Sequence, residues 1–361
     1  MSQHRPLPRP WLRRPARLAA PGFGLALLLT GCAGVAAPAD DGDTDDAATA
    51  AASDAVQGAS TAEPSTEPAA FPLTLDNCGV LVTVDAAPQR VVTIKSSATE
   101  MLLALGVGDR IVGAGFPDGP VPDEYADAAA DLPVMSDNVP SAEVVLQAEP
   151  DLVYAGWESN LTAEGAGDRG TLAGLGVATY VSPSACKDPA DQPDRLRFAD
   201  VFNQVTEIAG LLGVPDAASA LVDEQRAELD ALEPDGRGLT ALWYSSGDDV
   251  PYVGAGIGAP QMIMDAVGLT NIAAQVQDTW TSFSWEQVAQ DDPDVIVLVD
   301  ATWNSADQKR ELLATNPATA NLTAVRNERY LVVPFAATEA GVRNVPAAVD
   351  LGHRLAALDL G

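Results

Sequence analysis

The sequence predicts an α/β protein made of two Rossmann-like lobes with mostly parallel sheets, joined by a single long helix. Short apolar segments alternate with segments of helical periodicity in both halves of the chain, which is the pattern of repeated strand–helix units. Between the halves, residues 215–232 contain no glycine or proline after Pro215, so we expect one helix of roughly 27 Å there. The expected boundaries are 71–213 for the N-terminal lobe, 214–235 for the connecting helix and 236–361 for the C-terminal lobe.

The N-terminal lobe is expected to begin with a β-hairpin. Two short apolar stretches, 73–75 and 80–84, flank the turn residues Asp76-Asn77-Cys78-Gly79, as in a hairpin. The strands expected after it are 90–95, 110–115, 151–156 and 177–182, and the expected helices are 98–105, 142–148 and 169–175.

The second half begins with two helical stretches. Residues 198–212 have helical periodicity, Pro215 then opens the connecting helix, and Pro234-Asp235-Gly236 closes it. The strands expected beyond it are 239–245, 294–300 and 330–335, and the expected helices are 261–267, 284–290, 307–314 and 345–358.

The two halves also share a sequence unit. Ser141-x-Glu143 leads into Pro150-Asp151 and an apolar strand, and Ser284-x-Glu286 leads into Pro293-Asp294 and another strand with the same spacing. Residues 102–107 and 264–269 are similar as well. The dipeptide Pro-Asp is common before strands in unrelated proteins, but the shared Ser-x-Glu favours two related lobes.

The first 31 residues have the features of a secretory signal peptide. They carry five arginines and no acid, and an apolar run extends from Leu18 to Leu29, which is too short to span a bilayer. The ending Leu29-Thr30-Gly31-Cys32 resembles the bacterial lipobox, in which the cysteine receives a lipid and becomes the mature N-terminus. Cys32 is therefore the expected lipidation site; an ordinary signal peptide with a chance cysteine is the alternative.

Residues 32–70 are expected to be an acidic, disordered tether. From residue 33 on they hold eight acids, no base and almost no large apolar side chain, so they cannot bury enough surface to offset the entropy of ordering. The net charge of −31 becomes −36 without the five signal arginines, and the tether's eight acids leave about −28 on the lobes. This acidity argues against nucleic acid as a partner, and the protein is expected to be anchored to a membrane without spanning it.

Two cysteines remain after Cys32. Cys78 lies in the hairpin turn and Cys186 in a loop after an expected strand. In an oxidising exterior a disulfide persists, so a structural bond between them is favoured over two free thiols.

Taken together and in order, these features resemble one family. The lipobox, tether, hairpin, residues 89–94 and 99–106, both Glu…Pro-Asp units and the mid-chain helix look like the substrate-binding lipoproteins of ABC importers. The similarity covers about residues 71–358 and is to the siderophore and cobalamin type (class III, periplasmic-binding-protein-like), whose lobes are joined by a rigid helix. More narrowly, residues 118–122, 154–160, 242–247 and 333–344 resemble the actinobacterial subgroup proposed to bind coenzyme F420-0, a deazaflavin precursor.

The resemblance implies a role for the two repeated glutamates. In that family one glutamate at this position of each lobe pairs with arginines of the transporter's membrane subunits, and the matching residues here are Glu143 and Glu286. Two exposed acids at matched points would let the permease hold both lobes. The alternative is that each acid only complements the dipole of its own helix.

Histidine use argues against metal and hydrolase sites. The chain has two histidines, His4 in the signal and His353 in the last helix, whereas zinc receptors need several. No Gly-x-Ser-x-Gly motif is present for a serine hydrolase. We therefore predict no metal, no cofactor and no catalytic activity.

Ligand-binding residues are expected where strands end and face the other lobe. Lys95 and Ser96 directly follow the first core strand, and Arg343 follows the last one. Such a cation pair suits a phosphodiester or carboxylate ligand; solvated surface charges are the alternative. The sequence Ser97-Ala-Thr-Glu100 also reads as a helix capping box, which would still present backbone N–H groups to an anion.

The aromatic residues are also placed at strand ends and in loops. Trp157, Trp243, Tyr244 and Trp280 are the expected ligand-stacking residues, because flat ligands stack on such rings. Trp285 is more simply read as packing its own helix into the core.

These expectations describe a monomeric, lipid-anchored receptor on the extracytoplasmic side of the cell membrane. It would capture a small aromatic anionic ligand, with F420-0 first and a ferric siderophore or cobalamin second, and deliver it to ABC permease and ATPase subunits. The rigid helix implies only small lobe closure. An extracytoplasmic enzyme or a cell-wall scaffold is the alternative class; the single mature histidine disfavours the enzyme, and the twin glutamate units disfavour the scaffold.

Overall fold

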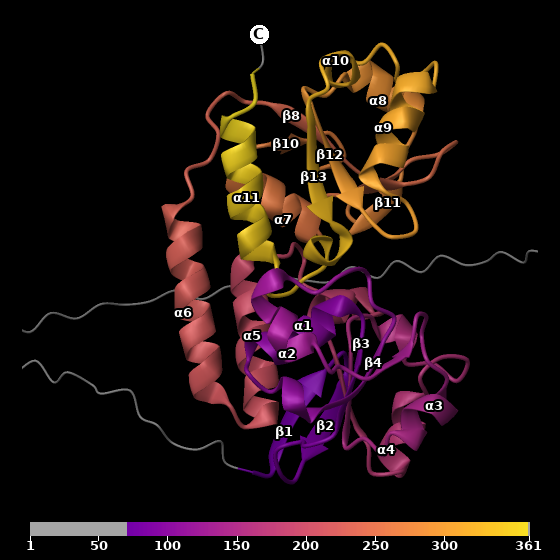
Figure 1. The fold of residues 1–361 in the computed structure, drawn as a ribbon, viewed down its shortest axis with the longest axis vertical. Coiled ribbons are helices and arrows are strands. Elements are labelled where there is room, and N and C mark those ends of the chain that lie inside the picture. The colour runs from indigo at the N-terminus through magenta and orange to yellow at the C-terminus, as the bar shows by residue number, and fades with distance from the viewer. Residues whose placement is uncertain (1–70, 360–361) are drawn as a thin grey trace, which may run out of the picture. The chain divides into compact units, whose positions relative to one another are not determined.

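A computed structural model of the protein describes residues 71–359, and these residues belong to one compact unit (Figure 1). The predicted signal peptide, the lipidation site Cys32 and the tether lie outside the described residues. Within the described part, no helix is both long enough and apolar enough to cross a membrane.

The N-terminal lobe is built on a five-stranded parallel sheet with the order β5-β4-β3-β6-β7. The strands are β3 (Val91–Ile94), β4 (Ile111–Gly115), β5 (Val134–Ser136), β6 (Leu152–Ala155) and β7 (Ala178–Val181). The helices are α1 (Ser96–Ala104), α2 (Ala126–Ala129), α3 (Ala142–Gln147) and α4 (Arg169–Gly174). The chain order reverses between β3 and β6, and open α/β sheets bind ligands beyond the carboxyl ends of strands at such a point.

A hairpin of β1 (Leu73–Asn77) and β2 (Val80–Val84) precedes this sheet. The buried Asn77 side chain exchanges two hydrogen bonds of 2.8 Å with the backbone of Val181 in β7. A disulfide joins Cys78 in the hairpin turn to Cys186 in the loop after β7. The hairpin therefore holds the end of β7 and the loop that follows it.

The C-terminal lobe has a mixed sheet with the order β11-β9-β8-β12-β13, and β10 pairs with the start of β8. The strands are β8 (Thr240–Ser246), β9 (Tyr252–Gly254), β10 (Thr270–Asn271), β11 (Trp280–Ser282), β12 (Val295–Asp300) and β13 (Tyr330–Pro334). The helices are α7 (Ala259–Val267), α8 (Trp285–Asp291), α9 (Ala306–Thr315), α10 (Thr323–Arg326) and α11 (Asn344–Ala356). β8, β10, β12 and β13 are parallel, and β9 and β11 add an antiparallel edge.

One long helix connects the lobes, and another helix precedes it. α5 (Phe198–Leu212) packs its apolar face into the core of the N-terminal lobe. Gly213, with φ at 70°, ends α5, and Pro215 begins α6 (Pro215–Ala231), which runs alongside it (Figure 1). α6 reaches the C-terminal lobe, where the Gln225 amide donates to the carbonyl of Val342 at 2.7 Å. The predicted fold class, two α/β lobes joined by one long helix, is confirmed.

Candidate functional site

A cavity of about 350 Å³ lies between the two lobes, at the carboxyl ends of their parallel strands. The N-terminal lobe and the loop after it supply mainly hydroxyl side chains and one cation: Ser97, Ser159, Ser182, Ser184 and Lys187, with the ring of Trp157. The C-terminal lobe supplies mainly rings and one acid: Tyr252, Trp280, Phe335 and Glu339, with Ser245, Thr279 and Thr338. Both lobes are therefore needed to form the cavity.

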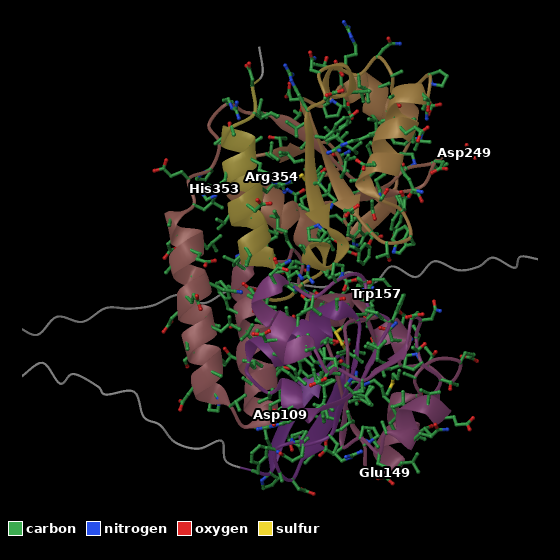
Figure 2. All side chains as sticks on the ribbon, viewed as in Figure 1. Asp109, Glu149, Trp157, Asp249, His353 and Arg354 are labelled. Atoms are coloured by element: carbon green, nitrogen blue, oxygen red, sulfur yellow. A yellow bond between two sulfur atoms is a disulfide. The ribbon has the colours of Figure 1, made fainter. Side chains whose placement is uncertain are left out.

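Aromatic rings form the walls of the cavity. Trp157 follows β6 and lies edge-on to Phe116, with 6.2 Å between ring centroids; Figure 2 shows it on the side of the N-terminal lobe that faces the other lobe. Opposite it, the antiparallel pairing of β9 with β11 brings Tyr252 and Trp280 together, stacked at 6.1 Å with 14° between their planes. The predictions that place Trp157 and Trp280 beside the cleft agree with these positions.

The prediction that Lys95 is a free cation for an anionic ligand is wrong. Its side chain is 1 % exposed and its Nζ forms an ion pair with Asp118, while Oε1 of Glu339 lies 3.4 Å away. The ammonium also lies 4.0 Å from the ring centroid of Trp157 and 4.8 Å from that of Phe335. Two carboxylates and the surrounding rings satisfy this cation beneath the cavity, so it does not face a ligand.

Arg343 is likewise paired and does not line the cavity. Its guanidinium forms a two-point ion pair with Glu100 of α1 and donates to the carbonyl of Pro120 at 2.8 Å. The predicted capping box is therefore absent: Glu100 bonds to the other lobe, and Lys95, with φ at 84°, takes the N-cap position of α1 without a side-chain cap. The sequence placed these residues near the interface but did not reveal their partners.

Ser97 and Glu339 form a polar link across the lobes. The Ser97 hydroxyl donates to Oε2 of Glu339 at 3.1 Å, and both side chains are buried. Burial raises the pKa of Glu339 to about 7, with Asp118 adding to the rise and Lys95 opposing it. Gly156 makes room for this arrangement, because a Cβ there would lie 2.8 Å from the Ser97 hydroxyl oxygen.

Three other predicted ligand residues lie away from the cavity. Trp243 is fully buried in the core beneath the C-terminal sheet. Tyr244 is buried against Trp285 on the other face of that sheet, and its hydroxyl donates to the carbonyl of Gly247. The Ser96 hydroxyl accepts from the backbone N–H of Asp118 at 2.8 Å. Alternate residues of a strand face opposite sides of the sheet, so both rings of β8 enter the core.

Lys187 is the lining cation that the sequence did not single out. Its side chain is exposed, and among residues 71–359 it forms no ion pair with a carboxylate. Its backbone N–H donates to Oε2 of Glu158 at 2.5 Å, and the neighbouring Cys186 is held by the disulfide. The sequence feature that could have identified Lys187 is its position next to Cys186, in a globular part that has only two other lysines.

The repeated Ser-x-Glu units form equivalent helix starts in the two lobes. Ser141 caps α3 by accepting from the N–H of Val144, and Ser284 caps α8 by accepting from that of Gln287. Glu143 and Glu286 are both exposed in the first turns. A hydrogen bond from Ser284 lowers the pKa of Glu286, which keeps that carboxylate charged.

The one histidine among residues 71–359 does not line the cavity. His353 is exposed on α11. Among residues 71–359, no three side chains of the histidine, cysteine, aspartate or glutamate type are grouped so as to hold a metal ion. Because residues of both lobes line the cavity between them, that cavity is the candidate ligand site.

Comparison with known proteins identifies the family of the chain. The chain matches the family described as periplasmic binding protein over residues 91–337. It is 24 % identical over 294 residues to the uncharacterized ABC transporter substrate-binding lipoprotein YvrC of Bacillus subtilis, which covers 79 % of this chain and 86 % of YvrC. It is 28 % identical over 282 residues to a cobalamin-binding protein of Halobacterium salinarum, covering 73 % of this chain and 68 % of that protein.

Solved structures show the same fold. A periplasmic binding protein from Veillonella parvula superposes with a TM-score of 0.69 at 24 % identity, covering 80 % of this chain and 98 % of that one. An ABC-type Fe3+-hydroxamate transport system protein from Saccharomonospora viridis superposes with a TM-score of 0.68 at 27 % identity, covering 79 % of this chain and 99 % of that one. Because the family match spans more than half of the sequence, the chain belongs to the periplasmic binding protein family.

Proposed function

We propose that this protein is the solute-binding component of an ABC importer, which captures a small molecule between its lobes and delivers it to a permease without chemical change. The observation that carries the proposal is the cavity with aromatic walls that both lobes build at the carboxyl ends of their strands. Relatives named as a substrate-binding lipoprotein and as a cobalamin-binding protein support the same role.

The lining favours a flat ligand with an anionic group. Trp157 and Trp280 offer ring faces or edges for stacking. Lys187 takes over the anion-binding role that was expected of Lys95 and Arg343, because its ammonium is exposed at the cavity. Coenzyme F420-0, with a planar deazaflavin ring and a phosphodiester tail, has both features and is the first candidate.

A cobalamin or a ferric siderophore is the second candidate. The support is the naming of two relatives, the cobalamin-binding protein and the Fe3+-hydroxamate transport protein. The cavity volume of about 350 Å³ lies at the low end of the ~300–1,000 Å³ found for small-molecule sites. That volume favours the deazaflavin over cobalamin, whose corrin ring and nucleotide are much bulkier.

The proposal includes a docking face and an anchor. Glu143 and Glu286 occupy matching, exposed helix starts on the two lobes, and we assign them to binding basic residues of the permease, one on each lobe. A lipid on Cys32 would hold a monomeric receptor at the outer side of the cell membrane, which agrees with the description of YvrC as a lipoprotein.

A ligand panel tests the proposal. The purified protein is titrated with F420-0, a ferric hydroxamate siderophore, haem and cobalamin, while tryptophan fluorescence and heat are followed. We expect saturable binding of F420-0 with quenching, because Trp157 and Trp280 line the cavity. Tight binding of a siderophore or cobalamin alone would replace the ligand and keep the receptor role, and no binding of any panel member would contradict the proposed function.

A further inference from the structure

A buried hydroxyl–carboxylate pair, Ser97 and Glu339, lines the cavity where the two lobes meet. Ser97 belongs to α1 of the N-terminal lobe, and Glu339 follows β13 of the C-terminal lobe. The two residues are 4 % and 9 % exposed, whereas Lys187 and Ser159 of the same lining are exposed. We call this pair the cavity floor.

The hydrogen-bonding capacity of the floor is one-sided. A serine hydroxyl has a single proton, and that of Ser97 is donated to Oε2 of Glu339, so Ser97 has only lone pairs left. An ionised carboxylate accepts hydrogen bonds and cannot donate. Oε1 of Glu339 receives no hydrogen bond in the structure, although Nζ of Lys95 is 3.4 Å away. The floor therefore has unused acceptor capacity and no free donor, and a ligand donor would reach it only by entering this buried end of the cavity.

The surroundings make these acceptors consequential. The rings of Trp157 and Phe335 line the cavity beside the floor, and a polar group enclosed by apolar surface gains more from a hydrogen bond than one in water. We infer that the floor selects ligands: the end of the ligand that enters first is a flat aromatic group that donates a hydrogen bond, through N–H or O–H, to the Ser97–Glu339 pair. This inference rests on the proposed function and specifies the chemistry of the ligand's buried end.

The charged groups around the floor give the selection a pH dependence. Lys95 at the end of β3 and Asp118 in the loop after β4 face Glu339, and the Glu100–Arg343 pair lies farther along α1. Because burial raises the pKa of Glu339 to about 7, the carboxyl is ionised above that pH and protonated below it. Once protonated it carries its own O–H, so its preference for a donor weakens.

Two matched probes test the floor without the natural ligand. 2-Naphthol and 2-methoxynaphthalene are both flat aromatic molecules, and only the first has a hydrogen to donate. Their affinities for the intact protein are measured by nuclear magnetic resonance, from the indole signals of the tryptophans. At about pH 8 we expect the naphthol to bind about tenfold more tightly, the size of one hydrogen bond to a charged acceptor, and this preference to shrink severalfold at about pH 6.

A variant locates the effect. Glu339→Gln should lose most of the preference and all of its pH dependence, whereas Glu228→Gln, on the exposed face of α6, should keep both. If Glu339→Gln does not fold, the pH comparison in the wild type decides. Equal affinities for the two probes, a preference unchanged in Glu339→Gln, or no binding of the naphthol would overturn the inference. None of those results changes the outcome of the ligand-panel titration, so this inference can fail while the proposed function stands.

Discussion

The two lobes are alike in topology and unlike in what they contribute to the cavity. Each has a central parallel sheet, and each presents a serine-capped helix with an exposed glutamate in its first turn. At the cavity, however, the N-terminal lobe and the loop after it contribute serines, one ring (Trp157) and the exposed Lys187, whereas the C-terminal lobe contributes three rings and the buried Glu339. Repeated units thus supply the outer surface, and unrepeated loops supply the site.

The two walls of the cavity are also held in place by different contacts. The serine-bearing loop after β7 is fixed by the disulfide and by the Asn77 side chain. The aromatic wall is fixed by the antiparallel β9–β11 edge, which has no counterpart in the N-terminal sheet. A change in one wall should therefore not be reproduced by the equivalent change in the other.

The repeated glutamates give the largest expected effect, because they are the feature the lobes share. Glu143→Ala and Glu286→Ala should each lower uptake of the bound ligand by about tenfold, and together nearly abolish it, since each lobe would lose its contact with the permease. Uptake is measured in cells that express the matching transporter. Glu228→Ala on α6 is the control. Normal uptake by the double variant, with ligand affinity unchanged, would refute the docking assignment.

The disulfide should matter for the serine-bearing wall alone. Replacing Cys78 and Cys186 together by serine removes a link between residues 108 apart in the sequence, and we expect the free energy of unfolding to fall by about 2–5 kcal/mol. The Lys187 loop should also exchange amide hydrogens faster. Denaturant unfolding of oxidised, reduced and variant protein measures this loss; equal stability of all three would contradict it.

The ion pair between the lobes is expected to contribute to stability within the same range as the disulfide. Arg343→Met leaves the buried Glu100 carboxylate without its partner, which should lower the free energy of unfolding by about 3 kcal/mol at neutral pH. Burial already raises the pKa of Glu100, and protonation removes the unpaired charge, so the loss should shrink as pH falls.

A matched surface pair is the control for this effect. Arg310 and Asp307 form an exposed ion pair on α9, so Arg310→Met should cost less than about 1 kcal/mol. Denaturant titrations at several pH values compare the two variants. Equal losses, or a loss for Arg343→Met that grows on acidification, would refute the buried interlobe pair.

Substitutions of tryptophan should distinguish residues of the cavity walls from residues of the core. Trp157→Leu and Trp280→Leu should each weaken ligand binding by about tenfold by removing a stacking surface. Trp243→Leu should lower stability and leave affinity within about twofold, because Trp243 is fully buried in the core. Calorimetric titration and thermal unfolding provide the two readouts, and a large affinity loss confined to Trp243→Leu would restore the original assignment.

The cation at the cavity gives the smallest expected effect. Lys187→Gln should weaken binding of an anionic ligand by roughly threefold to tenfold, less so in high salt, because the ammonium is exposed and screened. Lys187→Arg should keep most of the affinity, and Arg326→Gln, exposed on α10, should keep all of it. The same loss in the Arg326 variant would point to general charge and not to this site.

Sequence periodicity is sufficient to predict the positions of the long helices and strands. β12, from the apolar run 295–299, and α6, from the stretch after Pro215, lie within a residue or two of their expected bounds. β5, β9, β10 and β11 were missed because each has only two or three residues, too few for a period to show. Their strand geometry comes from pairing with neighbours and not from local preference.

The site was harder to predict, because its chemistry depends on partners far away in the chain. Lys95 and Arg343 stand where strands end, as expected, but Asp118, Glu339 and Glu100 neutralise them across the fold. Trp243 and Tyr244 lie in the middle of a strand that is buried on both faces, so their aromatic character reflects the core. Lys187 could not be predicted as a site residue, because its place at the cavity depends on a loop whose position is set by the disulfide.

Hydrogen–deuterium exchange of the protein with and without F420-0 tests most directly that the two unlike lobes form one site. We expect the ligand to slow exchange in the segments around Trp157 and residues 182–187 of the first wall, and around Trp280 and Glu339 of the second, because all of them line the same cavity. Protection confined to one lobe, or none in either, would contradict the account.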